Sequence, residues 1–146
     1  TGRDSVMQIL QRLAKTLVKY QDPQSGTWYQ VTDQGAREGN YLESSATALF
    51  IYTLAKAVNK GYIGKEYIQP TRKAFDGMVK TFTRLEEDGS YTITNCCAVA
   101  GLGGDSKRYR DGSFEYYISE PVIENDPKSV GSFILAAIEY EKMTDK

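Results

Sequence analysis

Two short polar segments stand immediately before apolar runs, and both carry residues suited to binding an anionic ligand. The first contains Asn40, Tyr41 and Glu43, and the second contains Asp126 and Lys128. The start of an α-helix offers unpaired backbone N–H groups and a partial positive charge, which favour anions. Asp126 is explained as a helix cap, whereas a lysine in the first turn of a helix opposes its dipole. Lys128 is therefore the stronger candidate ligand of an anion.

Glu43 has two interpretations that the sequence leaves open. It heads an otherwise apolar helix beside Ser44 and Ser45. A carboxylate in that position either completes a helix cap or belongs to a ligand site.

Trp28 also has two interpretations. It is the single tryptophan of the chain, which carries eleven tyrosines. Exposed aromatic faces beside amide and acidic side chains hold sugars, because the ring covers the apolar face of the sugar and the polar groups bind its hydroxyls. Alternatively, Trp28 and Tyr91 pack short extended segments onto the helices.

The composition excludes several classes of function. The 146 residues contain no histidine, so Ser-His-Asp and Cys-His nucleophiles and His-based metal sites are absent from this chain. The 18 basic and 19 acidic residues give a net charge of −1 without a basic run, which disfavours nucleic acid. No apolar run is long enough to span a membrane. The adjacent Cys96 and Cys97 meet disulfide geometry only with strain, so we expect small buried thiols.

Apolar periodicity predicts four helices that would position these residues. Residues 5–20 form an amphipathic helix capped by Asp4, and residues 42–58 are apolar on nearly every side. A third, amphipathic helix has Pro70 in its first turn, and a fourth, apolar on most faces, begins at Pro127. Between the helices we expect extended segments at residues 27–32, 91–94 and 114–118.

The alternation of amphipathic and apolar helices predicts an all-α fold, a partial α/α toroid of helical hairpins with short β-ribbons in its rim loops. Because both apolar helices follow long polar loops, their N-termini are expected to share one end. Four helices cannot close a ring or cover two helices that are apolar all round. We therefore expect either that about half or more of a toroid lies on the N-terminal side, or that the exposed inner-helix surface self-associates with another copy.

Four segments, taken in order, resemble glycoside hydrolase family 105. They are residues 26–31 (GTWYQV), residues 39–46 (GNYLESSA), the pair of segments 110–113 (RDGS) and 116–117 (YY), and residues 125–128 (NDPK). Family 105 comprises the unsaturated rhamnogalacturonyl hydrolases and is related to the family 88 unsaturated glucuronyl hydrolases. The resemblance implies that residues 1–146 are the C-terminal portion of one (α/α)6 toroid catalytic domain.

The resemblance also implies an activity: release of 4,5-unsaturated galacturonic acid from pectin oligosaccharides that a lyase has generated. In such enzymes an Asp protonates the double bond, water adds at C5, and the hemiketal opens, without cofactor or metal. That Asp belongs to the N-terminal part of the family, so no catalytic residue is assigned here and the isolated chain is expected to be inactive. The resemblance assigns six residues to the wall and rim of the substrate site: Trp28, Gln30, Asn40, Tyr41, Glu43 and Lys128.

Two other functions compete with this one. A non-catalytic carbohydrate-binding module of the same fold would use the same aromatic face. A helical-hairpin interaction protein is disfavoured, because its turns are short and uniform, whereas the loops at residues 22–41 and 86–125 are long and aromatic. The expected partner is an unsaturated oligosaccharide, with no nucleic acid and no membrane, and the compartment stays open between cytoplasm and periplasm.

Overall fold

The computed structural model describes residues 2–35, 37–104 and 109–144. Its long helices are α1 (Gly2–Tyr20), α2 (Ser44–Asn59), α3 (Ile68–Phe82) and α5 (Pro127–Thr144). A 3-10 turn, η1 (Lys65–Tyr67), leads into α3, and a short helix, α4 (Phe114–Ser119), precedes α5. The mostly helical fold predicted from the sequence is confirmed. None of the described helices has both the length and the apolar composition needed to cross a membrane.

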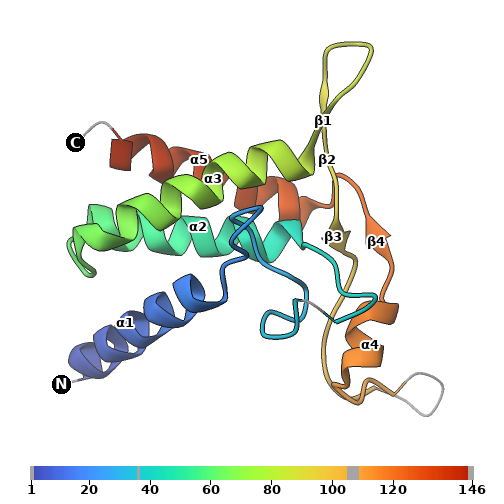
Figure 1. Cartoon of the computed structure of the whole chain (residues 1–146), viewed down its shortest axis with the longest axis horizontal. Helices are drawn as coiled ribbons and strands as arrows, with labels where there is room; N and C mark the ends of the chain where they lie inside the picture. Colours follow the sequence, from blue (N-terminus) through green and yellow to red (C-terminus); the bar gives the residue numbers. More distant parts are fainter. Residues whose placement is uncertain (1, 36, 105–108, 145–146) are drawn as a thin grey trace.

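Helices α2, α3 and α5 form a packed layer (Figure 1). At one end, Glu43 before α2 and Lys128 in α5 both bond to the segment at residues 97–98. Further along, the Asn59 amide at the end of α2 donates to the Glu139 carbonyl of α5, at 2.9 Å. Helices α2 and α5 are therefore parallel, and their N-termini share one end as predicted. The chain reverses through η1, so that α3 runs antiparallel to both.

Helix α1 stands apart from that layer (Figure 1), and few of its side chains are buried against the rest of the chain. Only Ala14 and Leu17 of α1 are buried. Trp28, which is fully buried, donates its indole N–H to the Leu17 carbonyl at 2.8 Å and packs edge-on against Phe50 of α2. The C-terminal half of α1 is thus anchored through Trp28, and the N-terminal half projects away.

The loop that carries Trp28 is held closely against α3. The Gln21 side chain donates to the Pro70 carbonyl at 2.9 Å. Gly77 lies so near this loop that a Cβ there would be 1.8 Å from the Ser25 carbonyl oxygen. Only a glycine permits that approach of helix and loop.

Two small antiparallel ribbons flank the common end of the helices. In the first, β1 (Thr83–Leu85) pairs with β2 (Tyr91–Ile93), with Arg84 opposite Thr92. In the second, β3 (Cys96–Cys97) pairs with β4 (Val122–Ile123). The ribbons confirm the extended segment expected near residues 91–94 and connect α3 to the start of α5.

Three local predictions were wrong or only partly right. Asp4 is not the cap of α1, because the helix begins at Gly2 and Asp4 lies in its first turn. The segment expected to be extended at residues 114–118 is helix α4, because the Ser113 hydroxyl caps it by accepting the Tyr116 N–H. Within residues 27–32, the β-structure is a single bridge between Tyr29 and Leu42.

Within this chain α2 and α5 each leave one apolar side uncovered, which is the exposed inner-helix surface that the sequence predicts. Leu49 of α2 is 48% exposed, and Ile134, Leu135 and Ile138 of α5 are 44–55% exposed. The buried residues of α5, which include Ala136 and Ser132, lie on its other side. One neighbouring layer can cover only one side of each helix, so the opposite apolar side faces solvent.

Candidate functional site

Glu43 joins the start of α2 to β3. Its side chain is buried, and one carboxylate oxygen accepts the Ala46 N–H at 2.6 Å, which caps the helix. The other oxygen accepts the Cys97 N–H of β3 at 3.0 Å and the Ser45 hydroxyl at 2.9 Å. Of the two interpretations that the sequence left open, the cap is therefore present. The same carboxylate also fixes β3 relative to α2.

The two cysteines of β3 are free and buried, as expected. Burial is the main cause that raises the pKa of the Cys96 thiol, and the nearby Glu43 charge adds to it. Burial also raises the pKa of the Tyr41 phenol, reinforced by the Cys97 thiol beside it and by Glu43. Both groups are therefore uncharged at neutral pH, and Tyr41 keeps a proton that it can donate.

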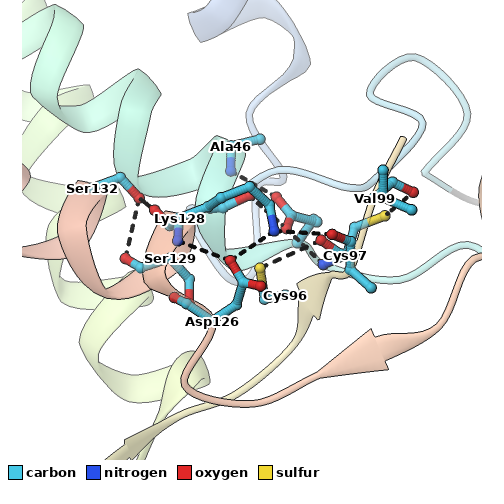
Figure 2. Close-up of polar contacts among 11 residues, drawn as sticks. Ala46, Cys96, Cys97, Val99, Asp126, Lys128, Ser129 and Ser132 are labelled. Atoms are coloured by element: carbon cyan, nitrogen blue, oxygen red, sulfur yellow. Dashed lines mark hydrogen bonds and ion pairs between the residues drawn. The ribbon is translucent and has the colours of Figure 1, made fainter. Parts of the chain in front are cut away.

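Lys128 reaches β3 from the first turn of α5 (Figure 2). Its ammonium group donates to the Ala98 carbonyl at 3.0 Å and to the Asp126 carboxylate at 2.7 Å. The Asp126 hydrogen bond raises the pKa of Lys128, and the Lys128 hydrogen bond lowers the pKa of Asp126. Because an ammonium group has three donors and the side chain is 52% exposed, Lys128 can still donate to an anion from solvent.

Asp126 caps α5 as predicted. The same carboxylate oxygen that binds the Lys128 ammonium also accepts the Lys128 backbone N–H, at 2.8 Å. Figure 2 shows Asp126 and Lys128 next to Cys96, with Ser129 in the same turn and Ser132 on the following turn of the helix. The cap therefore holds the lysine side chain in place over β3.

Gln30, which is distant from β3 in the sequence, contacts this strand and also lines a pocket. Its amide donates to the Cys97 thiol at 3.3 Å, next to the residue that Lys128 binds. The pocket has a volume of about 600 Å³ and lies between α1 and the loops. It is lined by apolar and aromatic side chains with a few polar ones, among them Leu13, Leu17, Tyr20, Asp33, Phe50 and Tyr117.

Trp28 and Asn40 do not face this site in the chain as described. Trp28 belongs to the core, so the alternative that it packs a loop onto the helices describes its position. Asn40 organises its own loop: its side-chain oxygen accepts the Val31 N–H, and its amide donates to the carbonyls of Val31 and Gln34. These positions do not support a direct contact of Trp28 or Asn40 with a ligand.

The segment at residues 110–113 also serves the local structure. Arg110 pairs through its backbone with Gly103 and lies 3.9 Å from the carboxylate of Glu120, which is buried. The Asp111 carboxylate accepts the Ser113 N–H at 2.8 Å, and Ser113 in turn caps α4. This motif thus fixes the start of α4, the helix that carries Tyr117 to the pocket.

The structure therefore brings together four of the six candidate residues around β3: Gln30, Tyr41, Glu43 and Lys128. The sequence reasoning missed the organising role of β3, since a strand of two residues has no periodicity to detect. Tyr20 and Tyr117 also line the pocket, but the sequence assigned neither to the site, although Tyr117 lies in the 116–117 motif. Among the described residues, no group of three Cys, Asp or Glu side chains is arranged to hold a metal ion.

Comparison with known proteins identifies the family to which the chain belongs. The family model described as Glycosyl Hydrolase Family 88 matches residues 1–144. The chain belongs to glycosyl hydrolase family 88. The resemblance noted in the sequence is confirmed, because solved structures of family 105 share the fold.

Two solved structures illustrate the relationship. A family 105 glycoside hydrolase from Clostridium acetobutylicum (C. acetobutylicum ATCC 824) is 42% identical, with a TM-score of 0.92 over 97% of this chain and 39% of that chain. A possible family 105 member from Salmonella enterica serovar Paratyphi A is 28% identical, with a TM-score of 0.77 over 98% of this chain and 32% of that chain. The toroid-type architecture expected for this glycosyl hydrolase family is thereby confirmed.

A curated relative adds information on length. Protein Atu3128 from Agrobacterium fabrum is 39% identical over 120 residues, which are 80% of this chain and 52% of that protein. The chain thus spans about half the length of the curated relatives it matches, and 32% to 39% of the two solved structures.

Proposed function

We propose that this chain forms part of an enzyme that releases 4,5-unsaturated galacturonic acid from lyase-generated pectin oligosaccharides. The observation that carries the proposal is the match of residues 1–144 to glycosyl hydrolase family 88, together with the likeness to a family 105 enzyme at 42% identity. The groups around β3 support it, because a uronate substrate presents a carboxylate and several hydroxyls.

The reaction is hydration of a carbon–carbon double bond, as the resemblance to families 105 and 88 implies. An acid protonates the C4 side of the double bond, and water adds at C5. The resulting hemiketal opens and releases the rest of the oligosaccharide. We place the acid, an Asp in these families, in a part of the domain outside residues 1–146, so the isolated chain is expected to be inactive.

In this proposal the residues around β3 bind and orient the substrate. Lys128 pairs with the uronate carboxylate through its remaining N–H, helped by the N-terminal end of α5. Gln30 and the Tyr41 phenol donate hydrogen bonds to hydroxyls. Glu43 does not contact the sugar: it positions β3, against which Lys128 and Gln30 are set.

A second function is a non-catalytic carbohydrate-binding module of the same fold. The observation in its favour is the pocket of about 600 Å³, whose apolar and aromatic lining lies beside the Gln30 amide. Such a module would bind the oligosaccharide without consuming its double bond.

An absorbance assay distinguishes the two functions. The double bond of a lyase-generated oligosaccharide absorbs ultraviolet light, and hydration removes that absorbance. We expect the absorbance to fall with a full-length enzyme that contains these residues and to stay constant with this chain alone. Binding by both proteins with a constant absorbance would instead support the carbohydrate-binding module.

A further inference from the structure

The Cys97 thiol lies between two of the residues to which the proposed function assigns sugar binding. Its sulfur accepts a hydrogen bond from the Gln30 amide at 3.3 Å. It also lies beside the Tyr41 phenol, whose pKa it helps to raise. Cys97 is free and only 6% exposed. A buried thiol that meets two candidate ligand-binding side chains can set their positions.

Gln30 and Tyr41 reach Cys97 from paired segments of the chain. Tyr29 bridges to Leu42, and the Gln30 backbone N–H donates to the Tyr41 carbonyl at 2.8 Å. Gln30 and Tyr41 are therefore directly opposite each other, and side chains at opposite positions project on the same side. Cys97 of β3 meets both side chains on that side, so one sulfur lies against two donors that the backbone already places next to each other.

The thiol hydrogen determines which end of the Gln30 amide faces the sulfur. The Cys97 S–H donates to the Val99 carbonyl at 3.5 Å, which leaves the sulfur as an acceptor toward Gln30. The amide nitrogen must then face the sulfur, because an amide oxygen there would find no hydrogen to accept. The second N–H and the oxygen of the Gln30 amide stay available to a ligand.

The backbone around Cys97 is held at several points. The Cys97 N–H donates to the buried Glu43 carboxylate at 3.0 Å, and Cys97 pairs with Val122 of β4. The next carbonyl, that of Ala98, accepts from the Lys128 ammonium group at 3.0 Å. Residues 97–98 therefore set the position of the Lys128 side chain as well as that of the Gln30 amide.

We propose that Cys97 is a positioning residue for substrate binding. Its sulfur orients the Gln30 amide and spaces it from the Tyr41 phenol, so that both groups donate to hydroxyls of the same sugar. Cys97 does not touch the sugar and affects affinity through Gln30. The inference rests on the function proposed above and adds a residue that this function does not itself require.

Steady-state kinetics of a complete enzyme that contains this chain test the inference. Cys97→Ala removes the acceptor and should raise KM for the unsaturated oligosaccharide about fivefold, with kcat changed less than about twofold. Cys97→Ser keeps an acceptor and should return KM to within about twofold of the unmodified enzyme. If Cys97 only packed, the order would reverse, because a hydroxyl is costlier to bury than a methyl group. Cys97→Ser with a KM no lower than that of Cys97→Ala would therefore overturn the inference.

Val122→Ala is the matched control. Val122 lies opposite Cys97 in the ribbon and is half exposed, so this change trims the ribbon without removing the sulfur. KM should stay unchanged. An equal rise of KM in Val122→Ala and Cys97→Ala would show that the ribbon, and not the thiol, controls binding, and would overturn the inference.

A second measurement needs no substrate. Heteronuclear NMR of the isolated chain follows the side-chain amide of Gln30, assigned by its loss in Gln30→Met. Cys97→Ala should shift these resonances toward those of a solvent-exposed glutamine, whereas Val122→Ala should leave them in place. Hydration of the substrate by the unmodified enzyme together with unmoved Gln30 resonances in Cys97→Ala would overturn the inference alone. A constant absorbance with the unmodified enzyme would overturn the proposed function, and the inference with it.

Discussion

Lys128 is the residue on which substrate binding is expected to depend most directly. In a complete enzyme that contains this chain, Lys128→Ala should raise KM for the unsaturated uronate by about tenfold or more, because it removes a charged hydrogen-bond donor. The melting temperature should change little, since the side chain is half exposed. Steady-state kinetics by the absorbance assay check this.

Lys128→Arg is the matched control for that experiment. It keeps the positive charge but not the compact geometry that lets one group contact Ala98, Asp126 and a ligand. An intermediate KM is expected. Unchanged kinetics in Lys128→Ala would show that the lysine serves only the start of α5.

Glu43 is expected to stabilise the fold and not to contact the substrate. Glu43→Ala removes the acceptor for the N–H groups of Ala46 and Cys97 and should lower the free energy of unfolding by about 2 kcal/mol. Urea denaturation of the isolated chain measures this. Glu38→Ala, at an exposed position, is the control and should be nearly neutral. A Glu43→Ala variant as stable as the control would contradict the role assigned to this carboxylate.

Asp126 should make part of the stability depend on pH. Its hydrogen bond with Lys128 lowers the pKa of the folded carboxyl group below that of the unfolded chain. The stabilisation is therefore complete above the unfolded pKa of about 4 and is lost as the pH falls through the lower folded pKa. Asp126→Asn keeps a capping oxygen but does not titrate. The difference in unfolding free energy between the two proteins should shrink from pH 6 toward pH 2, and a constant difference would contradict this.

The sequence predicted individual site residues better than their grouping. The dipole argument identified Lys128, and the cap argument identified Asp126, because both depend on neighbours within one turn. Trp28 was ambiguous, since stacking on a sugar and packing in a core require the same ring. The junction at β3 could not be predicted, because it joins Gln30, Glu43 and Lys128 through contacts between residues 30 to 67 positions apart.

At the scale of elements, the contact between α3 and the loop before Trp28 is the most sensitive to substitution. Gly77→Ala would place a Cβ 1.8 Å from the Ser25 carbonyl oxygen, so the loop or the helix must move. We expect a loss of about 1–3 kcal/mol of unfolding free energy. Chemical denaturation and the fluorescence of Trp28 report the stability and the displacement.

Gly131→Ala in α5 is the matched control for that variant. A Cβ at Gly131 would meet no atom within 4 Å. Alanine in a helix is favoured over glycine by about 0.5–1 kcal/mol, so this change should be neutral or stabilising. Equal losses in both variants would show that the close approach at Gly77 is not what limits stability.

The helices were predicted well because each carries a periodic apolar pattern together with a start or stop signal. Pro127 follows its cap Asp126, and α2 ends before Gly61, whose φ is +68°. Helix α4 was mistaken for a strand, because its aromatic residues favour extended structure and its six residues show no helical period. The Ser113 cap, a local hydrogen bond, decides its conformation.

At the scale of the whole molecule, the exposed apolar surfaces of α2 and α5 follow from the part of the fold that this chain contains. Their composition is that of helices enclosed in a ring, whereas this chain covers 39% of the C. acetobutylicum relative. The sequence of these helices suits burial in the complete toroid that the family resemblance implies. In this chain, α1, α3 and the loops bury only part of each helix.

Hydrogen exchange should reveal the same difference along the chain. In the isolated chain, amides at residues 2–12 of α1 should exchange rapidly, because no side chain there is buried, whereas those of α2 should be protected by a buried face. In a fusion of this chain with the part of the C. acetobutylicum enzyme that it does not match, residues 2–12 should become protected, while the exposed β1–β2 hairpin stays unchanged. Exchange followed by mass spectrometry measures both. Strong protection of residues 2–12 in the isolated monomer would contradict this expectation and mean that α1 is stable without a covering helix.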